Sequence, residues 1–198
     1  TPGVQRKAEI IAETFNKTGG VSELDMMKLK NEIAHHPDFD KRMKVTLRDG
    51  ELLIIFHGSA VFAEGSYTLD ADTISMVDTL IDMIKTHDTE YRILIEGHAD
   101  KNESLLGGNM NHWSLSAARA ASVISRFEYY GFKSEFMVAV AKGDREPVAE
   151  YKTNAKNSVP PLEISKLNRR VVIKVLEPVG KKRNMRIGAL FRDAESGE

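Results

Sequence analysis

The alternation of strand-like and helix-like segments between residues 43 and 178 constrains the fold of this chain most strongly. Two apolar runs flank Asp49 and Gly50, a pair that favours a tight type I′ turn, so this region predicts a β-hairpin. Apolar residues spaced three and four apart predict helices. The predicted order is a hairpin at 44–56, a helix at 69–86, a strand at 91–96, a helix at 115–130, and strands at 136–141 and 171–176. Strands interleaved with helices predict an α+β sandwich with helices on one face of a sheet.

The chain divides into three predicted parts. Residues 1–42 carry apolar residues at helical spacing and predict two short amphipathic helices. These helices either dock on the main body or form a linker that leads from an N-terminal anchor. Residues 43–178 form the main domain, in which the loop at 143–167 is long enough to be functional or mobile. Residues 179–198 predict a polar, solvated tail.

Composition excludes several kinds of site. The chain has 28 Lys and Arg against 29 Asp and Glu, which argues against broad electrostatic binding to nucleic acid. It has no cysteine, so disulfides, thiol catalysis and thiolate metal sites are excluded. The six histidines show no metal-ligand spacing, and no nucleophile, phosphate-binding or dinucleotide motif occurs. We therefore expect no enzyme activity, no metal and no cofactor, and we expect His98 to brace a loop by hydrogen bonding.

The polar stretch after the strand at 91–96 predicts a ligand site, because strand ends and helix N-termini open a crevice in such folds. Asp100 leaves this strand and Arg119 lies in the first turns of the next helix. On opposite lips of one crevice, they would match a ligand end that carries both an ammonium and a carboxylate. The alternative is that they pair with each other, or with Glu96, as ordinary surface ions. Arg169 and Arg170 enter the last strand, where one could face the crevice while the other is solvated.

Four motifs in register give the main domain a family resemblance. They are FAEGS at 62–66 followed by Leu69, ILIEGHAD at 93–100, WSLSAARAASV at 113–123, and GD at 143–144 followed by Pro147 and NRRV at 168–171. Together they resemble the OmpA-like peptidoglycan-binding domain over residues 43–178. The resemblance implies the βαβαββ-type sandwich of that family, with helices packed on a mixed sheet.

One branch of the family is more similar than the others. Trp113 before Leu-Ser, the long loop ahead of it and the N-terminal helices resemble flagellar-motor stator B subunits, the MotB family. One departure is that the family asparagine usually lies directly before the tryptophan. Here His112 takes that place and Asn111 lies one residue earlier.

The resemblance implies a role for each matched residue. In this family the matched Asp100 and Arg119 hold the diaminopimelate of a peptidoglycan stem peptide, with Asp100 accepting from the ammonium and Arg119 donating to the carboxylate. The remaining members of the implied site line the crevice or steady its far lip: Leu115, Phe62, Asn168 and Arg170. The implied function is non-covalent anchoring to the cell wall, with no bond made or broken.

The resemblance also implies partners and a location. A stator B subunit is expected to act as a homodimer beside its channel-forming A subunits, in the periplasm, with a membrane segment that this chain does not contain. No apolar run reaches the roughly 18–20 residues needed to span a bilayer, and the start at Thr1 is expected of a mature protein or an excised fragment. We further expect residues 1–42 to rearrange between resting and wall-engaged states, with Gly19 and Gly20 as the hinge.

Three alternative interpretations stay open. The first is an OmpA/Pal-type envelope protein that tethers the outer membrane to peptidoglycan without a motor role. The second is a wall-modifying enzyme that uses His98 and Asp100. The third is a structural interaction domain whose crevice has lost its ligand.

Overall fold

The computed structural model describes residues 20–39, 42–56, 61–87, 90–105, 109–148 and 161–178. The first predicted helix, Gly19 and the predicted tail at 179–198 lie outside these residues. Within the described part of the chain, no helix is long and apolar enough to cross a membrane. In chain order the elements are α2 (Gly20–Ala34), β1 (Met43–Arg48), β2 (Glu51–Phe56), α3 (Ala71–Thr86), β3 (Arg92–Gly97), α4 (His112–Tyr129), the 3₁₀ helix η2 (Ser134–Phe136), β4 (Met137–Ala141), α5 (Pro161–Asn168) and β5 (Val171–Leu176).

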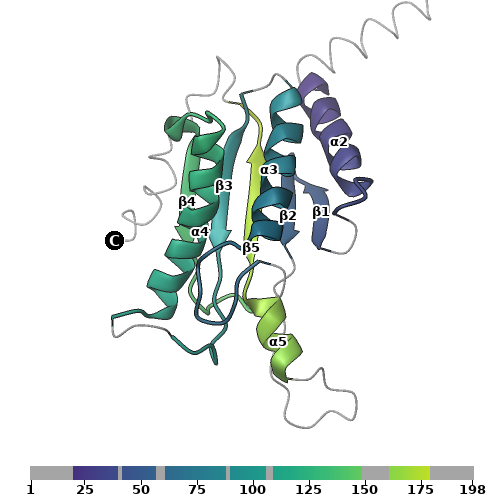
Figure 1. The fold of residues 1–198 in the computed structure, drawn as a ribbon. Coiled ribbons are helices and arrows are strands. Elements are labelled where there is room, and N and C mark those ends of the chain that lie inside the picture. The colour runs from purple at the N-terminus through teal and green to yellow at the C-terminus, as the bar shows by residue number, and fades with distance from the viewer. Residues whose placement is uncertain are drawn as a thin grey trace, which may run out of the picture.

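The strands form a mixed sheet in the order β1-β2-β5-β3-β4. Strands β3 and β4 are parallel, whereas the pairs β1–β2, β2–β5 and β5–β3 are antiparallel. Helices α2, α3 and α4 cover one face of this sheet, and α5 lies at the end where β3 finishes (Figure 1). The predicted α+β class is confirmed, and β2, α3, β3, α4, β4 and β5 follow the βαβαββ order.

The hairpin of β1 and β2 forms as the sequence predicts. Its register pairs Met43 with Phe56 and Arg48 with Glu51, so two residues remain for the turn. Those residues, Asp49 and Gly50, have φ values of 53° and 77°. Two successive positive φ values are what a type I′ turn requires, and Asn, Asp and Gly adopt them at the lowest cost.

The hydrophobic core lies between the sheet and the three long helices. Alternate residues of the strands face it, and α2 contributes three fully buried side chains to the same cluster. The principal members are Met26, Leu29 and Ile33 of α2, Leu52, Ile54 and Phe56 of β2, Ile93 and Ile95 of β3, and Ile173 and Val175 of β5. Helix α2 therefore packs as an integral layer of the domain rather than lying apart from it.

Two helices differ from the sequence-based prediction. Helix α4 begins at His112, three residues before the predicted start, because Asn111 caps it. Helix α5 occupies residues inside the predicted loop at 143–167. Its signal in the sequence is Pro161 at the first helical position, where the missing N–H of proline costs nothing.

Strand β3 and helix α4 approach each other closely at Gly97. A Cβ atom built on Gly97 would lie 1.9 Å from the carbonyl oxygen of Ser116 and 3.1 Å from the backbone nitrogen of Ala120. These are backbone atoms in the middle of a helix, so they cannot move aside as a flexible side chain would. Only glycine fits at this position, and the close contact fixes the start of α4 against the end of β3.

Gly97→Ala tests this constraint. We expect a loss of at least about 3 kcal/mol in the free energy of unfolding, because strand and helix must separate to admit the methyl group. Gly131→Ala is the matched control: Gly131 has a φ of +85°, and nothing lies within 4 Å of its added Cβ, so only backbone strain of about 1–2 kcal/mol applies. Urea unfolding followed by circular dichroism measures both, and equal losses would contradict the close-contact argument.

Candidate functional site

Backbone hydrogen bonds hold three strand ends together where the site was predicted. Directly after β3, the His98 N–H donates to the carbonyl of Arg170 at 3.0 Å and the Ala99 N–H donates to the carbonyl of Gly143 at 2.8 Å. Lys142 N–H donates to the Gly97 carbonyl at 3.0 Å. The ends of β3 and β4 and the start of β5 therefore form one rigid frame, from which the polar side chains project.

Arg119 is fully buried at the centre of this frame. Its Nε donates to the Ser66 carbonyl at 2.9 Å, and its Nη1 donates to the His98 carbonyl at 3.1 Å. Both terminal nitrogens also donate to the carboxylate of Glu103, with Nη1 at 2.9 Å from Oε2 and Nη2 bonded to Oε1. The planar guanidinium thus makes the bidentate carboxylate contact that its geometry favours.

Glu103 is the functional residue that sequence reasoning missed. It is 5% exposed, and besides Arg119 its carboxylate accepts from the Gly65 N–H at 2.8 Å and from the Asp100 N–H at 3.3 Å. Among the described residues the carboxylate that pairs with Arg119 belongs to Glu103 and not, as the alternative prediction had it, to Asp100 or Glu96. Glu103 is a loop residue, which no periodic pattern could identify. The predicted contact of Arg119 with a ligand stays a prediction.

Asp100 is also buried, with 1% exposure. The side-chain amide of Asn168 donates to its Oδ2 at 2.8 Å, and the Asn102 N–H donates to its Oδ1 at 2.9 Å. Asn168 in turn accepts from the Val148 N–H at 2.9 Å. The predicted proximity of Asp100 and Asn168 is therefore seen directly, and the amide fixes the orientation of the carboxylate.

The two arginines before β5 are both buried, which corrects the prediction that one of them is solvated. Arg169 is 5% exposed and Arg170 is 7% exposed. Arg170 Nη2 donates to the Glu146 carbonyl at 2.9 Å, and burial lowers its pKa. Strand alternation predicted an exposed face here, but Arg170 is held against the loop after β4 by its bond to Glu146, and Arg169 is buried as well.

The two predicted apolar lining residues are both buried. The centre of the Phe62 ring lies 5.1 Å from Cζ of Arg119, a cation–π distance, and Phe62 is 3% exposed. Leu115 is one turn before Arg119 on α4 and has no exposed surface. The Phe62 ring lowers the local dielectric around Arg119, which strengthens its contacts with carboxylates.

The displaced asparagine of the motif caps helix α4. The Asn111 side chain accepts from the Ser114 N–H at 2.8 Å, and the Ser114 hydroxyl accepts from the Asn111 N–H at 2.8 Å. His112 takes the first helical position, with Nδ1 at 3.5 Å from a carboxylate oxygen of Asp144. Trp113 remains 49% exposed, so it borders the site with an open ring face.

A second charged cluster lies beside the frame. Lys174 Nζ is 2.8 Å from Glu96 Oε1, and Lys142 Nζ is 2.8 Å from Glu146 Oε1 and 3.8 Å from Glu96. Glu96, His98 and Glu146 are close enough to be considered as metal ligands. However, both carboxylates are already neutralised by lysines, so an added cation would have to displace them. We interpret the group as an ion-pair cluster.

The His98 ring does not brace the loop as predicted. Within the described residues neither ring nitrogen has a hydrogen-bond partner, and Nε2 lies 3.8 Å from Glu96, which is too long for a hydrogen bond. Burial lowers the pKa of His98 and favours the neutral ring. It is the backbone N–H and carbonyl of His98 that tie β5 and Arg119 to the frame.

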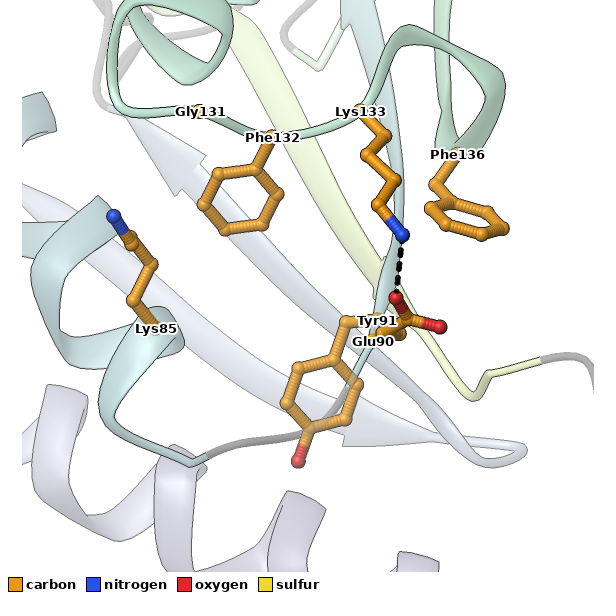
Figure 2. Close-up of a pocket in the computed structure, with 7 residues that line it drawn as sticks. All are labelled: Lys85, Glu90, Tyr91, Gly131, Phe132, Lys133 and Phe136. Atoms are coloured by element: carbon orange, nitrogen blue, oxygen red, sulfur yellow. Dashed lines mark hydrogen bonds and ion pairs between the residues drawn. The ribbon is translucent and has the colours of Figure 1, made fainter.

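The cavity drawn in Figure 2 lies away from these residues. It has a volume of about 210 Å³ and is lined by residues that precede β3 and follow α4, among them Tyr91, Phe132 and Phe136. Lys133 Nζ pairs with Glu90 at 2.9 Å across its mouth (Figure 2). Because it adjoins the beginning of β3, it lies at the opposite end of the sheet from Asp100 and Arg119.

The ion-pair cluster predicts a pH dependence of stability. Burial would raise the pKa of Glu96, but the charges of Lys174 and Lys142 outweigh it and lower the pKa from 4.5 to about 2. A carboxyl whose pKa falls on folding contributes stability that is complete above about pH 4.5 and is lost as the pH falls toward 2. Glu96→Gln should therefore flatten the decline in unfolding free energy over this window.

Unfolding by urea between pH 2 and pH 7 measures that decline. Lys174→Met removes the nearest positive partner and should give an intermediate slope, because Lys142 remains. A Glu96→Gln variant that declines as steeply as the unchanged protein would contradict the assignment of the acid sensitivity to this cluster.

The comparisons with solved structures agree on the fold. The cell wall anchor of the T6SS from Pseudomonas aeruginosa has 23% sequence identity and a TM-score of 0.60, with 76% of this chain and 94% of that chain covered. The periplasmic domain of Helicobacter pylori MotB has 18% identity and a TM-score of 0.57, with 76% and 94% covered. A putative MotB-like protein from Desulfovibrio vulgaris has 19% identity and a TM-score of 0.58, with 88% and 99% covered.

The sequence comparisons identify the family. No curated protein sequence matches this chain. The OmpA family model matches residues 61–159, which is half of the 198 residues and contains Phe62, Asp100, Leu115 and Arg119. The matched segment runs from before α3 to beyond β4, so it contains the ends of β3 and β4 but not the start of β5. This chain therefore belongs to the OmpA family.

Proposed function

We propose that this protein binds the stem peptide of peptidoglycan without covalent chemistry and so anchors a flagellar motor stator to the cell wall. The observation that carries the proposal is the arrangement of Asp100 and Arg119 on one rigid frame. Glu103 Oε2 accepts from the Asp100 N–H at 3.3 Å and from Arg119 Nη1 at 2.9 Å, so one carboxylate group touches both residues. A diaminopimelate end carries an ammonium that can donate to the Asp100 carboxylate and a carboxylate that can accept from the Arg119 guanidinium.

Each site residue has a physical role in this proposal. Asp100, oriented by Asn168, would accept from the ligand ammonium, while the Arg119 fork would donate to the ligand carboxylate. Phe62 and Leu115 exclude water from the guanidinium, and Arg170 holds the loop carbonyl of Glu146 in place. Buried, preorganised charges discriminate strongly against ligands that lack either group, because an unpaired charge in this environment is costly.

The comparisons support an anchoring role over catalysis. One similar structure is a cell wall anchor and others are MotB periplasmic domains, and this chain shares their fold. A wall-modifying enzyme built on His98 and Asp100 is less well supported. The His98 ring is buried with no hydrogen-bond partner among the described residues, so it does not form the base–acid pair that such chemistry needs.

The proposal includes a location and partners. We place the domain in the periplasm, attached to an inner-membrane segment outside this chain, as a homodimer beside stator A subunits. Two wall-binding sites on one tethered dimer raise the effective affinity, so each site can be weak alone. The MotB-like fold neighbours support this assignment. An experiment described below distinguishes it from the alternative of an OmpA/Pal-type tether without a motor role.

Retention on purified sacculi tests the wall-binding proposal. Asp100→Asn removes the charge that the ammonium needs, and Arg119→Lys keeps a positive charge but loses the fork, so each should lower the affinity by about tenfold or more. Lys133→Ala, in the cavity at the other end of the sheet, is the control and should be retained normally. Circular dichroism and thermal melting confirm that each variant is folded.

Two results would count against wall binding by this site. Full retention of both site variants would exclude Asp100 and Arg119 as ligand contacts. Release of soluble muropeptides by the protein alone would support the enzyme interpretation instead.

The coding sequence upstream of Thr1 tests the stator assignment. We expect it to encode a single apolar helix with an acidic residue within the membrane, because ion-driven motion requires a titratable group there. A lipoprotein cysteine in its place would contradict the stator and support the outer-membrane tether. Deletion of the gene gives the functional readout: cells should lose swimming while their flagella still assemble.

A further inference from the structure

The carboxylate-binding half of the proposed site is already filled by a side chain of the same protein. Glu103 receives two bonds from Arg119 and one each from the backbone N–H groups of Gly65 and Asp100. A carboxylate has about four lone-pair positions, so this one is fully used. A guanidinium fork with two backbone donors is also what a ligand carboxylate would require at this place.

Glu103 belongs to the loop that follows β3 and not to the frame of strand ends. Its neighbours Asn102 and Ser104 are exposed, as is Lys101, while Glu103 itself is buried. The same loop also contacts the segment before α3, where the Ser104 N–H donates to Glu64 at 3.1 Å. Because the residues on both sides of Glu103 are exposed, an outward movement of residues 101–105 would carry Glu103 out of the site, while Arg119, Phe62 and the strand ends stay in place.

We propose that Glu103 is an internal competitor for the carboxylate of the ligand. Ligand binding at Arg119 is then an exchange, in which the ligand carboxylate replaces that of Glu103 and the loop at 101–105 swings outward. The exchange keeps the buried guanidinium paired before and after binding, which avoids the cost of an isolated buried charge. This inference rests on the proposed function, since it concerns the same site.

The inference has a quantitative consequence. If the binding-competent state is the one with Glu103 displaced, the apparent dissociation constant exceeds the intrinsic one by the inverse of that state's population. Minor conformations of this kind are populated at roughly 0.1–10%. Removing the competitor should therefore tighten ligand binding by at least about tenfold.

Calorimetric titration of the intact chain with free meso-diaminopimelate provides the test. Glu103→Gln removes the negative charge with little change of shape, and Glu103→Asp keeps the charge but shortens the reach to Arg119. We expect both to bind at least about tenfold more tightly than the unchanged protein. Glu135→Gln, an exposed change in η2 away from the site, should leave the affinity unchanged. Equal or weaker binding by both Glu103 variants would overturn the inference.

A second measurement does not depend on the cell wall. Glu103→Ala leaves a carboxylate-shaped gap beside Arg119, so acetate should raise its melting temperature relative to chloride at equal ionic strength. The unchanged protein should show no such difference, because Glu103 already occupies the position. Absence of acetate stabilisation in a folded Glu103→Ala protein would overturn the inference that the Glu103 carboxylate occupies a carboxylate-binding position at Arg119. If Glu103→Ala does not fold, the Glu103→Asp affinity decides.

The two measurements separate failure of this inference from failure of the proposed function. Acetate stabilisation of Glu103→Ala together with no diaminopimelate binding by any variant would support an exchangeable carboxylate and refute the peptidoglycan ligand. Wall retention that depends on Asp100 and Arg119, without any gain in the Glu103 variants, would support the proposed function and refute the competitor.

Discussion

A guanidinium with no exposed surface must find a partner for each of its donors, and the site of this protein is organised around that requirement. Arg119 satisfies it with the Ser66 carbonyl, the His98 carbonyl and both oxygens of Glu103. Those partners come from the segment before α3, from the end of β3 and from the following loop, so one side chain of α4 connects regions far apart in sequence. Because burying an unpaired charge costs several kcal/mol, each of these segments is held to the position that Arg119 dictates. The same enclosure that makes the arginine selective for a carboxylate also explains why the protein supplies one of its own.

Most of the fold could be predicted because it follows local, periodic rules. The hairpin turn follows from Asp49 and Gly50, whose positive φ values need those residue types. The helices and strands follow from the spacing of apolar residues, which also indicates which face of each element is buried. The errors lie where a single side chain sets a boundary: Asn111 starts α4 earlier than its apolar stripe does, and Pro161 starts a short helix within a stretch that is otherwise polar. The packing of α2 on β1 and α3 could not be derived either, since an apolar stripe says that a helix is covered but not what covers it.

The proximity of the predicted site residues could be predicted from the sequence, but the contacts between them could not. Asp100, Arg119, Phe62 and Asn168 do gather at one end of the sheet, as the family motifs imply. Asp100 bonds to Asn168 and Arg119 stacks on Phe62. The pairing of Arg119 with Glu103 was missed because loop residues have no periodicity from which a direction can be inferred. The exposure of Arg169 or Arg170 was predicted wrongly for a related reason, since strand alternation describes the sheet faces and not the loops that close over a strand end.

The strand order carries a consequence for how the protein is made. Among the described residues β5 is the last strand to be synthesised, yet it lies between β2 and β3, and it is antiparallel to both. Until residues 171–176 emerge from the ribosome, β2 and β3 have no shared neighbour and the two halves of the sheet cannot join. The nascent chain therefore exposes the apolar faces of both halves until β5 is made, and cooperative folding of the sheet waits for that strand. A truncation that removes only this strand would leave two incomplete sheets with unpaired edges, which makes the C-terminal strand the step that commits the whole chain to its native state.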